Sequence, residues 1–283
     1  MLSQTRPAAV AGTWYPRTAG ALGREVDGYL ANVPDDRAPA DVGALIAPHA
    51  GLMFSGPVAA HAYKAVAARP YDVAVLVGPS HFVAFDGVAL YPGAAFDSPL
   101  GQARVDEAGA DAMAAFDVIE PDAGPHEREH SLEMQLPFLK RVLPDVPIVP
   151  LLMGYQDRET IGALADAMAA AFRTRRALLI ASTDLSHYFD ATTAESLDRR
   201  VQDCVPEVDA DRFLAVFEQY PEGDRGRYVA CGGGPAIAVM RAARLLGATA
   251  GRVLRYSHSG VISGDYDGVV GYMAAIFARP HSS

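Results

Sequence analysis

Short apolar runs alternate along this chain with longer segments in which apolar residues recur at helical spacing. Runs rich in valine, isoleucine and leucine predict buried strands over 42–47, 71–77, 146–152 and 177–183. Weaker patterns predict strands over 87–91, 252–257 and 269–277. Helical periodicity predicts helices over 21–31, 58–68, 106–116, 131–143, 157–172 and 232–246, and a mainly helical region over 193–220.

This alternation is typical of an α/β protein. We expect one domain over residues 1–283, with a central, largely parallel or mixed sheet and helices on both faces. For the helix over 58–68, Ser55 suits the N-cap and Pro57 suits the first turn. The aromatic pair Trp14 and Tyr15 predicts an ordered N-terminal arm that packs on the core.

Three of the expected strands are each followed by a histidine. His49 follows Pro48, His81 follows Pro79-Ser80, and His187 follows Asp184-Leu-Ser186. Ligands of open α/β sheets bind outside the carboxyl ends of the strands, so these side chains are expected to share a pocket. His49 and His81 are candidate metal ligands, because neutral imidazole is the commonest protein ligand for transition metals.

His187 lies close in sequence to Asp184, so it is a candidate general acid or base with Asp184 as its partner. It is equally a candidate metal ligand, or part of a hydrogen-bonded turn. Cys231 precedes three glycines and a predicted helix, whose N-terminus favours the thiolate form. A thiolate is a ligand or a nucleophile, whereas a buried cysteine is often inert.

The segment 126–135 is dense in polar residues. Glu129, His130 and Glu133 are candidates for substrate contact or for supporting the site, as are Ser80 and Tyr188 beside the other histidines. A charged start of a surface helix explains the same segment equally well. The spacing is not the His-Glu-x-x-His pattern of zinc proteases.

Composition narrows the function classes further. The net charge of -10 and the scattered basic residues argue against nucleic acid and anionic membranes as partners. No apolar run is long enough to span a membrane, and two cysteines in 283 residues favour a cytoplasmic location. The glycines after Cys231 lack the lysine of a phosphate-binding loop, so we expect no nucleotide cofactor.

Taken together, these segments resemble the Memo family, the protein B component of the AMMECR1–Memo–radical SAM gene set. The matching pieces include Ala11-Gly-Thr-Trp-Tyr15, Ala47-Pro-His-Ala-Gly51, Gly78-Pro-Ser-His81, Glu129-His-Ser-Leu-Glu133, Ser182-Thr-Asp-Leu-Ser-His-Tyr188 and Cys231-Gly232. They keep a consistent order over nearly the whole chain, and only their combination is specific.

The resemblance implies a fold like that of class III extradiol dioxygenases, which hold non-haem iron with two histidines and a glutamate. It implies that His49 and His81 are metal ligands, that His187 is the acid or base, and that Cys231 stands where those dioxygenases have their carboxylate. It also implies association with radical SAM and AMMECR1-domain proteins. A thiolate favours softer ions and oxidises readily, which argues against catechol ring opening.

Three functions therefore follow as hypotheses. The first is a redox enzyme with one transition metal, iron or copper, on His49, His81 and Cys231, acting on a small molecule. The second is a zinc hydrolase with His187 as its base. The third is a protein without catalytic activity that binds a peptide or a partner protein in the same pocket.

Overall fold

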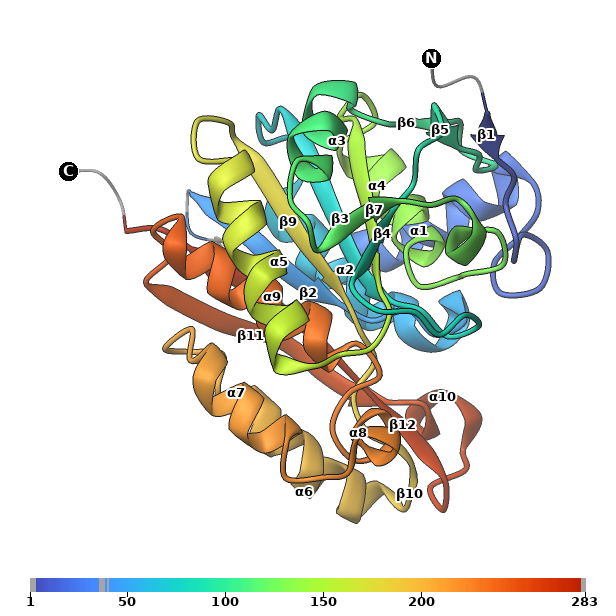
Figure 1. The fold of residues 1–283 in the computed structure, drawn as a ribbon. Helices are drawn as coiled ribbons and strands as arrows, with labels where there is room; N and C mark the ends of the chain where they lie inside the picture. Colours follow the sequence, from blue (N-terminus) through green and yellow to red (C-terminus); the bar gives the residue numbers. More distant parts are fainter. Residues whose placement is uncertain (1–3, 36–38, 40, 281–283) are drawn as a thin grey trace.

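The structure is a computed structural model that describes residues 4–35, 39 and 41–280. At its centre are four parallel strands in the order β2, β9, β3, β8 (Figure 1). Their bounds are Val42–Ala47, Ala177–Ser182, Val73–Pro79 and Ile148–Met153. Nearly every residue of these strands is buried, as expected for strands covered on both faces.

Antiparallel pairing makes the sheet mixed at both sides. Next to β2 lies β12, which also pairs with the edge strand β11 and with the short β10. Next to β8 lies β4, followed by β7. These strands are β4 (Val88–Leu90), β7 (Ile119–Pro121), β10 (His187–Phe189), β11 (Ala250–His258) and β12 (Val269–Ala278).

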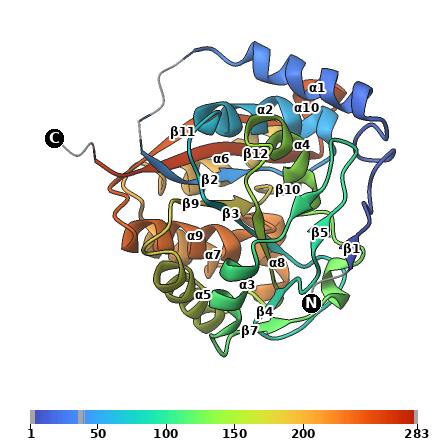
Figure 2. The same cartoon turned by 90° about the horizontal axis from the view of Figure 1, so that it is seen from above.

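Helices cover both faces of the sheet (Figure 2). One layer consists of α1 (Ala19–Asn32), α2 (Leu52–Val66) and α4 (Leu136–Val142). The opposite layer contains α3 (Glu107–Ala114), α5 (Arg158–Ala171), α6 (Ala191–Gln202), α7 (Ala210–Phe217) and α9 (Gly233–Leu245). Side-chain oxygens cap five helix starts, from Thr18, Asp106, Asp157, Asp190 and Asp209.

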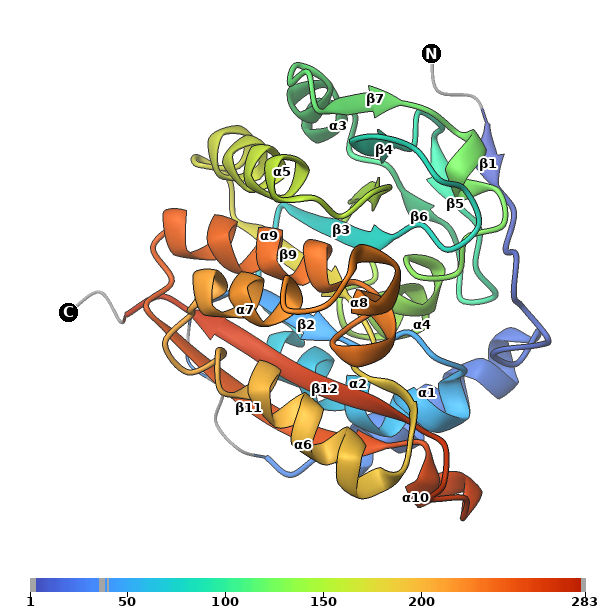
Figure 3. The ribbon, with the colours of Figure 1, turned by 60° about the horizontal axis from the view of Figure 1, so that its bottom comes forward.

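Smaller elements complete the described chain. A short sheet joins β1 (Thr5–Arg6), β5 (Ala95–Phe96) and β6 (Ala103–Arg104). The short helices α8 (Glu222–Tyr228) and α10 (Gly260–Ser263) lie near β10 and β12 (Figure 3), and 3-10 turns span Gly124–His126 and Glu133–Gln135. Among the described residues, no helix combines the length and apolar character needed to cross a membrane.

The predicted fold class is confirmed, and most predicted elements lie within two residues of their expected bounds. Two predicted helix starts were wrong. The helix predicted from residue 131 begins at Leu136, after a 3-10 turn over Glu133–Gln135. Helix α2 begins at Leu52, directly after the turn at His49, and not at Val58. Its N-cap is Gly51, and the Ser55 hydroxyl donates to the Ala50 carbonyl. Pro57 therefore lies inside the helix, where it removes one hydrogen-bond donor but does not end the helix.

Candidate metal centre

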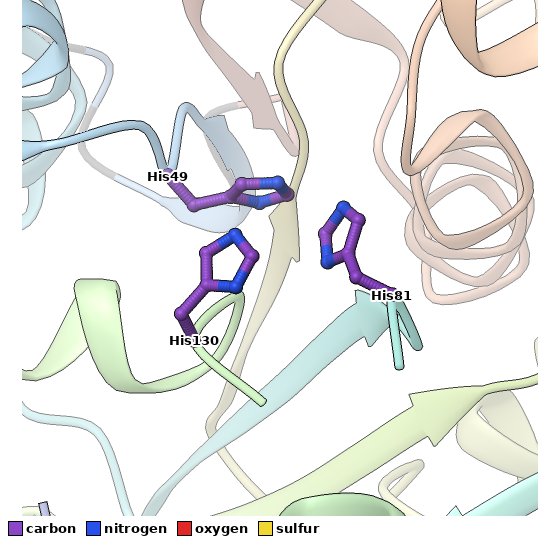
Figure 4. Close-up of side chains that lie close together, drawn as sticks. All are labelled: His49, His81 and His130. Atoms are coloured by element: carbon purple, nitrogen blue, oxygen red, sulfur yellow. The ribbon is translucent and has the colours of Figure 1, made fainter. Parts of the chain in front are cut away.

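The carboxyl ends of β2 and β3 bring His49 and His81 to the same edge of the sheet. A third histidine, His130, reaches this edge from the loop before the 3-10 turn at Glu133–Gln135. The three imidazoles point toward one another from these separate segments (Figure 4). One ligand atom of each lies within 4.8 Å of the others, an arrangement that can hold a metal ion.

Cys231 belongs to the same site, although its sequence position is remote. Its Sγ lies 3.2 Å from His49 Nε2 and accepts a hydrogen bond from the Asp184 amide at 3.3 Å. The next residue, Gly232, packs so closely on β9 that a Cβ there would lie 2.5 Å from the Ser182 carbonyl oxygen. The glycine thus allows the turn before α9 to place the sulfur beside the histidines.

The Cys231 thiol ionises more easily than an ordinary thiol. Burial opposes ionisation, but the charge of His49 and hydrogen bonds from His49 and His81 outweigh it and lower the thiol pKa to about 6. The same contacts act on His81, where burial lowers the pKa but Cys231 and Glu129 raise it to about 10. Without a metal, the site therefore favours a thiolate beside a protonated His81 at neutral pH.

The hydrogen bonds around Ser182 fix the tautomer of His49. The Ser182 hydroxyl has one hydrogen, which it donates to the Ser131 carbonyl at 2.6 Å. Its oxygen accepts from Gln135 Nε2 at 2.7 Å and lies 2.9 Å from His49 Nδ1. Because the hydroxyl has no second hydrogen to give, His49 Nδ1 must be the donor. The hydrogen bond from Nε2 to the Cys231 sulfur then requires a protonated ring, whereas a neutral His49 presents its lone pair at Nε2, where a metal would bind.

Glu129 fixes His81 in the same way. Its Oε1 accepts from His81 Nδ1 at 2.9 Å, and its Oε2 accepts from the His81 amide at 2.6 Å. The amides of His130 and Ser131 also donate to Oε1. Burial raises the pKa of Glu129, but the bonds and charge of His81 reverse this and lower it. Such a carboxylate–histidine pair is a common support of metal-ligating imidazoles and leaves Nε2 free.

These contacts correct one interpretation of the sequence. Glu129, His130 and Glu133 are buried, so the segment is not the charged start of a surface helix. No sequence pattern singles out Ser182 or Gln135, because a serine inside an apolar strand and a glutamine near a helix start are common. Only the fold shows that Gln135 also binds Tyr63 and the Pro48 carbonyl.

We expect Ser182→Ala to weaken metal binding by about 10- to 100-fold, the usual effect of losing a group that orients a ligand. The variant keeps all proposed ligand atoms but leaves His49 Nδ1 without its acceptor. Competition with a chromophoric chelator measures the affinity. Ser98→Ala, another buried serine, is the control. Equal affinity of Ser182→Ala and wild type would contradict this role.

His187 and Asp184 lie beside the cluster. Asp184 accepts from the amides of His49 at 2.8 Å and Ala50 at 3.3 Å, so it holds the turn that carries His49. Burial raises the pKa of the Asp184 carboxyl, and the charge of His187 opposes this. Burial lowers the pKa of His187, opposed by Asp184. His187 Nδ1 has no hydrogen-bond partner among the described residues.

Three other residues that the sequence analysis selected do not belong to the histidine cluster. The Glu133 carboxylate is directed to the N-terminal arm, where it binds Arg6 and Tyr15. The Ser80 hydroxyl donates to the Val83 carbonyl in the turn around His81. Tyr188 is largely exposed, has a positive φ of 63°, and its ring lies 5.6 Å from that of His187.

Two partly exposed aromatic side chains lie next to His130 of the cluster. The N-terminal arm is ordered as predicted and Tyr15 is buried in the core, but Trp14 lies with its ring 4.2 Å from that of His130. Phe82 lies 5.9 Å from the same ring, and both aromatic residues are more than one-third exposed. This apolar rim was not predicted, because the sequence alone does not place Trp14 next to His130.

The donor set fits a transition metal. His49 and His81 present Nε2 atoms whose other ring nitrogens are hydrogen-bonded, and Cys231 supplies a sulfur that ionises easily. Imidazole together with thiolate suits copper, iron and zinc rather than magnesium or calcium. His130 adds a third imidazole to the same centre.

The protein is thus a mixed α/β protein with a candidate metal centre of histidines at the carboxyl ends of its parallel strands. Sequence comparison identifies its family. The family model described as Memo-like protein matches residues 6–276. A MEMO1 family protein of Methanopyrus kandleri is 35% identical over 288 residues, covering 97% of this chain and 99% of that protein. A MEMO1 family protein of Aquifex aeolicus is 30% identical over 275 residues, with 97% and 99% coverage. The chain belongs to the Memo family.

A solved structure with low sequence identity has a similar fold. An uncharacterized protein from Escherichia coli superimposes with a TM-score of 0.57 at 12% identity, covering 83% of this chain and 99% of that one. At this identity the likeness concerns the fold alone, and it agrees with the mixed α/β architecture that the sequence predicts.

Proposed function

We propose that this Memo family protein is a metal-dependent redox enzyme that holds one iron or copper ion on His49, His81 and Cys231 and acts on a small molecule. The observation that supports this proposal most directly is the convergence of two oriented imidazoles and an acidic thiol. His130 faces the same centre, as a further ligand or as a contact for the substrate.

A bound iron or copper ion would supply one-electron chemistry to the site. The chain's own residues would do the rest. Ser182 and Glu129 keep the two imidazoles in their ligating tautomers. The Asp184 amide stabilises the negative sulfur of Cys231 through its hydrogen bond at 3.3 Å.

His187 is the residue that we expect to transfer protons. Burial keeps it neutral near physiological pH, so it can accept a proton from a substrate. The neighbouring Asp184 carboxylate stabilises the imidazolium that forms, since its charge raises the pKa of His187. Trp14 and Phe82 favour a substrate with an apolar surface, because both rings lie next to His130 and are partly exposed.

Oxygen uptake by the reconstituted protein tests the proposal. Protein loaded separately with Fe(II), Cu(I) or Zn(II) is supplied with ascorbate in air-saturated buffer. We expect the iron or the copper form to consume oxygen faster than the same metal in buffer, and faster than the equally loaded Cys231→Ser variant. Retention of zinc alone, with no oxygen uptake above the buffer rate, would contradict redox function and favour a hydrolase.

Alkylation of Cys231 tests the third ligand. In the metal-free protein the thiol should react with iodoacetamide readily at pH 7, because its pKa of about 6 leaves mostly thiolate, and the rate should fall as pH drops through that value. Bound metal should slow the reaction by at least about tenfold, since ligation occupies the sulfur lone pair. Mass spectrometry of the Cys231 peptide measures the rate, with buried Cys204 as the internal control. Equal rates with and without metal would rule out ligation by sulfur.

A further inference from the structure

A break in the regular alternation of β11 places two arginines on one face of this edge strand. Arg252 is paired with Ile276, and Arg255 with Ala274, with a register shift between Val253 and Arg255. In a regular strand, residues three apart point to opposite faces. The extra residue of the bulge restores Arg255 to the face of Arg252, since Ile276 and Ala274 are two residues apart on β12.

That face looks toward α2. The opposite face of β11 is directed to α6, where the Tyr256 hydroxyl donates to Asp198 at 2.8 Å. Figure 2 shows α2 lying along β11, and the two elements pack together. Between them lies a cavity of about 500 Å³. It is at the C-terminal end of α2, about 20 Å from the His49 turn at the helix start, given 15 residues at 1.5 Å each.

Five of the twelve described residues that line this cavity are basic. They are His61, Lys64, Arg69, Arg252 and Arg255, opposed by the carboxylate of Asp35. Lys64 binds Asp35 at 2.8 Å, but Asp35 is almost fully exposed, so this pair is weak. Arg252 and Arg255 make no ion pair or hydrogen bond within the described parts of the chain. In these parts of the chain, no side chain competes with a ligand for the two guanidinium groups.

The size and the lining indicate what kind of ligand fits. A volume of this order suits a small molecule. Ala65, Val253 and Leu254 give the cavity an apolar part beside the basic groups. Guanidinium groups match the oxygens of phosphate in a bidentate manner, and do so better than ammonium groups. The concentration of cations also contrasts with the net charge of -10 for the whole chain.

We propose that the cavity between α2 and β11 binds a small molecule that carries a phosphoryl group, with Arg252 and Arg255 as its principal contacts. Charged residues on an edge strand also protect it from pairing with other chains. Protection of the edge would not require the bulge that directs both arginines to one cavity. It would also not require the additional basic residues that α2 contributes to the lining. The site is separate from the histidine cluster and does not depend on the function proposed for it.

Titration calorimetry of the full chain with inorganic pyrophosphate tests this site. We expect saturable binding of one pyrophosphate per chain. The double variant R252Q/R255Q should bind at least about tenfold more weakly, because charge-assisted hydrogen bonds are lost. R158Q/R212Q, which removes the same charge from exposed arginines elsewhere, should bind like wild type. His81→Ala should also bind like wild type, which would exclude the histidine cluster as the pyrophosphate site.

Three outcomes would overturn the proposal. They are a lack of saturable binding to wild type at millimolar pyrophosphate, equal affinities of wild type and R252Q/R255Q, and equal losses in the two double variants, which would indicate bulk charge only. Circular dichroism establishes that each variant is folded. Since all four arginines have exposed positions, we expect no loss of fold in either double variant.

Discussion

His49→Ala and His81→Ala should each reduce the bound metal from near one ion per chain to background. Each substitution removes one of two imidazoles whose tautomer the fold has set for ligation. The remaining ligands would lose the geometry that selects a transition metal. Inductively coupled plasma mass spectrometry of protein purified from metal-supplemented cultures measures the content.

The fold should survive both substitutions. The His81 side chain is partly exposed, so its removal leaves no closed cavity. His49 is buried and its loss leaves Ser182 without one partner, which costs about 1–3 kcal/mol. His61→Ala is the matched control, because that histidine lies on α2 outside the cluster. Wild-type metal content in both His49→Ala and His81→Ala would refute the ligand assignment.

Much of the fold could be predicted because the buried parallel strands carry a strong apolar signal. The runs over 42–47 and 177–183 needed no tertiary information. The start of α2 could not be predicted in the same way. Its cap is a glycine and its first residues follow the His49 turn directly, whereas Ser55 and Pro57 imitate a start several residues later.

The site was predictable where the topology alone sets a position. His49 and His81 follow parallel strands that both pair with β9, so their convergence follows from the sheet. The position of Cys231 followed from the family resemblance, and its 3.2 Å contact with His49 supports that placement. The approach of His130 and Trp14 depends on how two loops pack, and no pattern of local residues encodes that distance.

The N-terminal arm owes its position to one buried carboxylate. Glu133 accepts hydrogen bonds from Arg6 at 2.6 Å, from the Tyr15 hydroxyl at 2.7 Å, and from the amides of Ala9 and Val10. Arg6 also donates to the carbonyls of His126 and Glu129. The segment 126–135 therefore has two structural roles. Glu129 orients His81, and Glu133 holds the N-terminal arm that carries Trp14.

Glu133→Ala should destabilise the protein by about 3–5 kcal/mol, because it leaves the buried Arg6 guanidinium without its counter-ion. The released arm should carry Trp14 away from His130 into water, so the emission of this single tryptophan should shift to longer wavelength. Trypsin should cleave after Arg17 faster than in wild type. Urea unfolding, fluorescence and timed proteolysis measure these effects, and exposed Glu120→Ala is the control.

Glu133→Gln keeps the shape of the side chain and part of its hydrogen bonding, so it provides the test if Glu133→Ala does not fold. It should show the same changes at smaller size, because the charge that balances Arg6 is gone while one carbonyl acceptor remains. Wild-type stability, emission and cleavage rate in Glu133→Gln would mean that the arm is held by its backbone contacts instead, such as the Leu52 amide to the Trp14 carbonyl at 2.9 Å. In that case Glu133 would be replaceable, and the position of Trp14 over the cluster would depend on the start of α2.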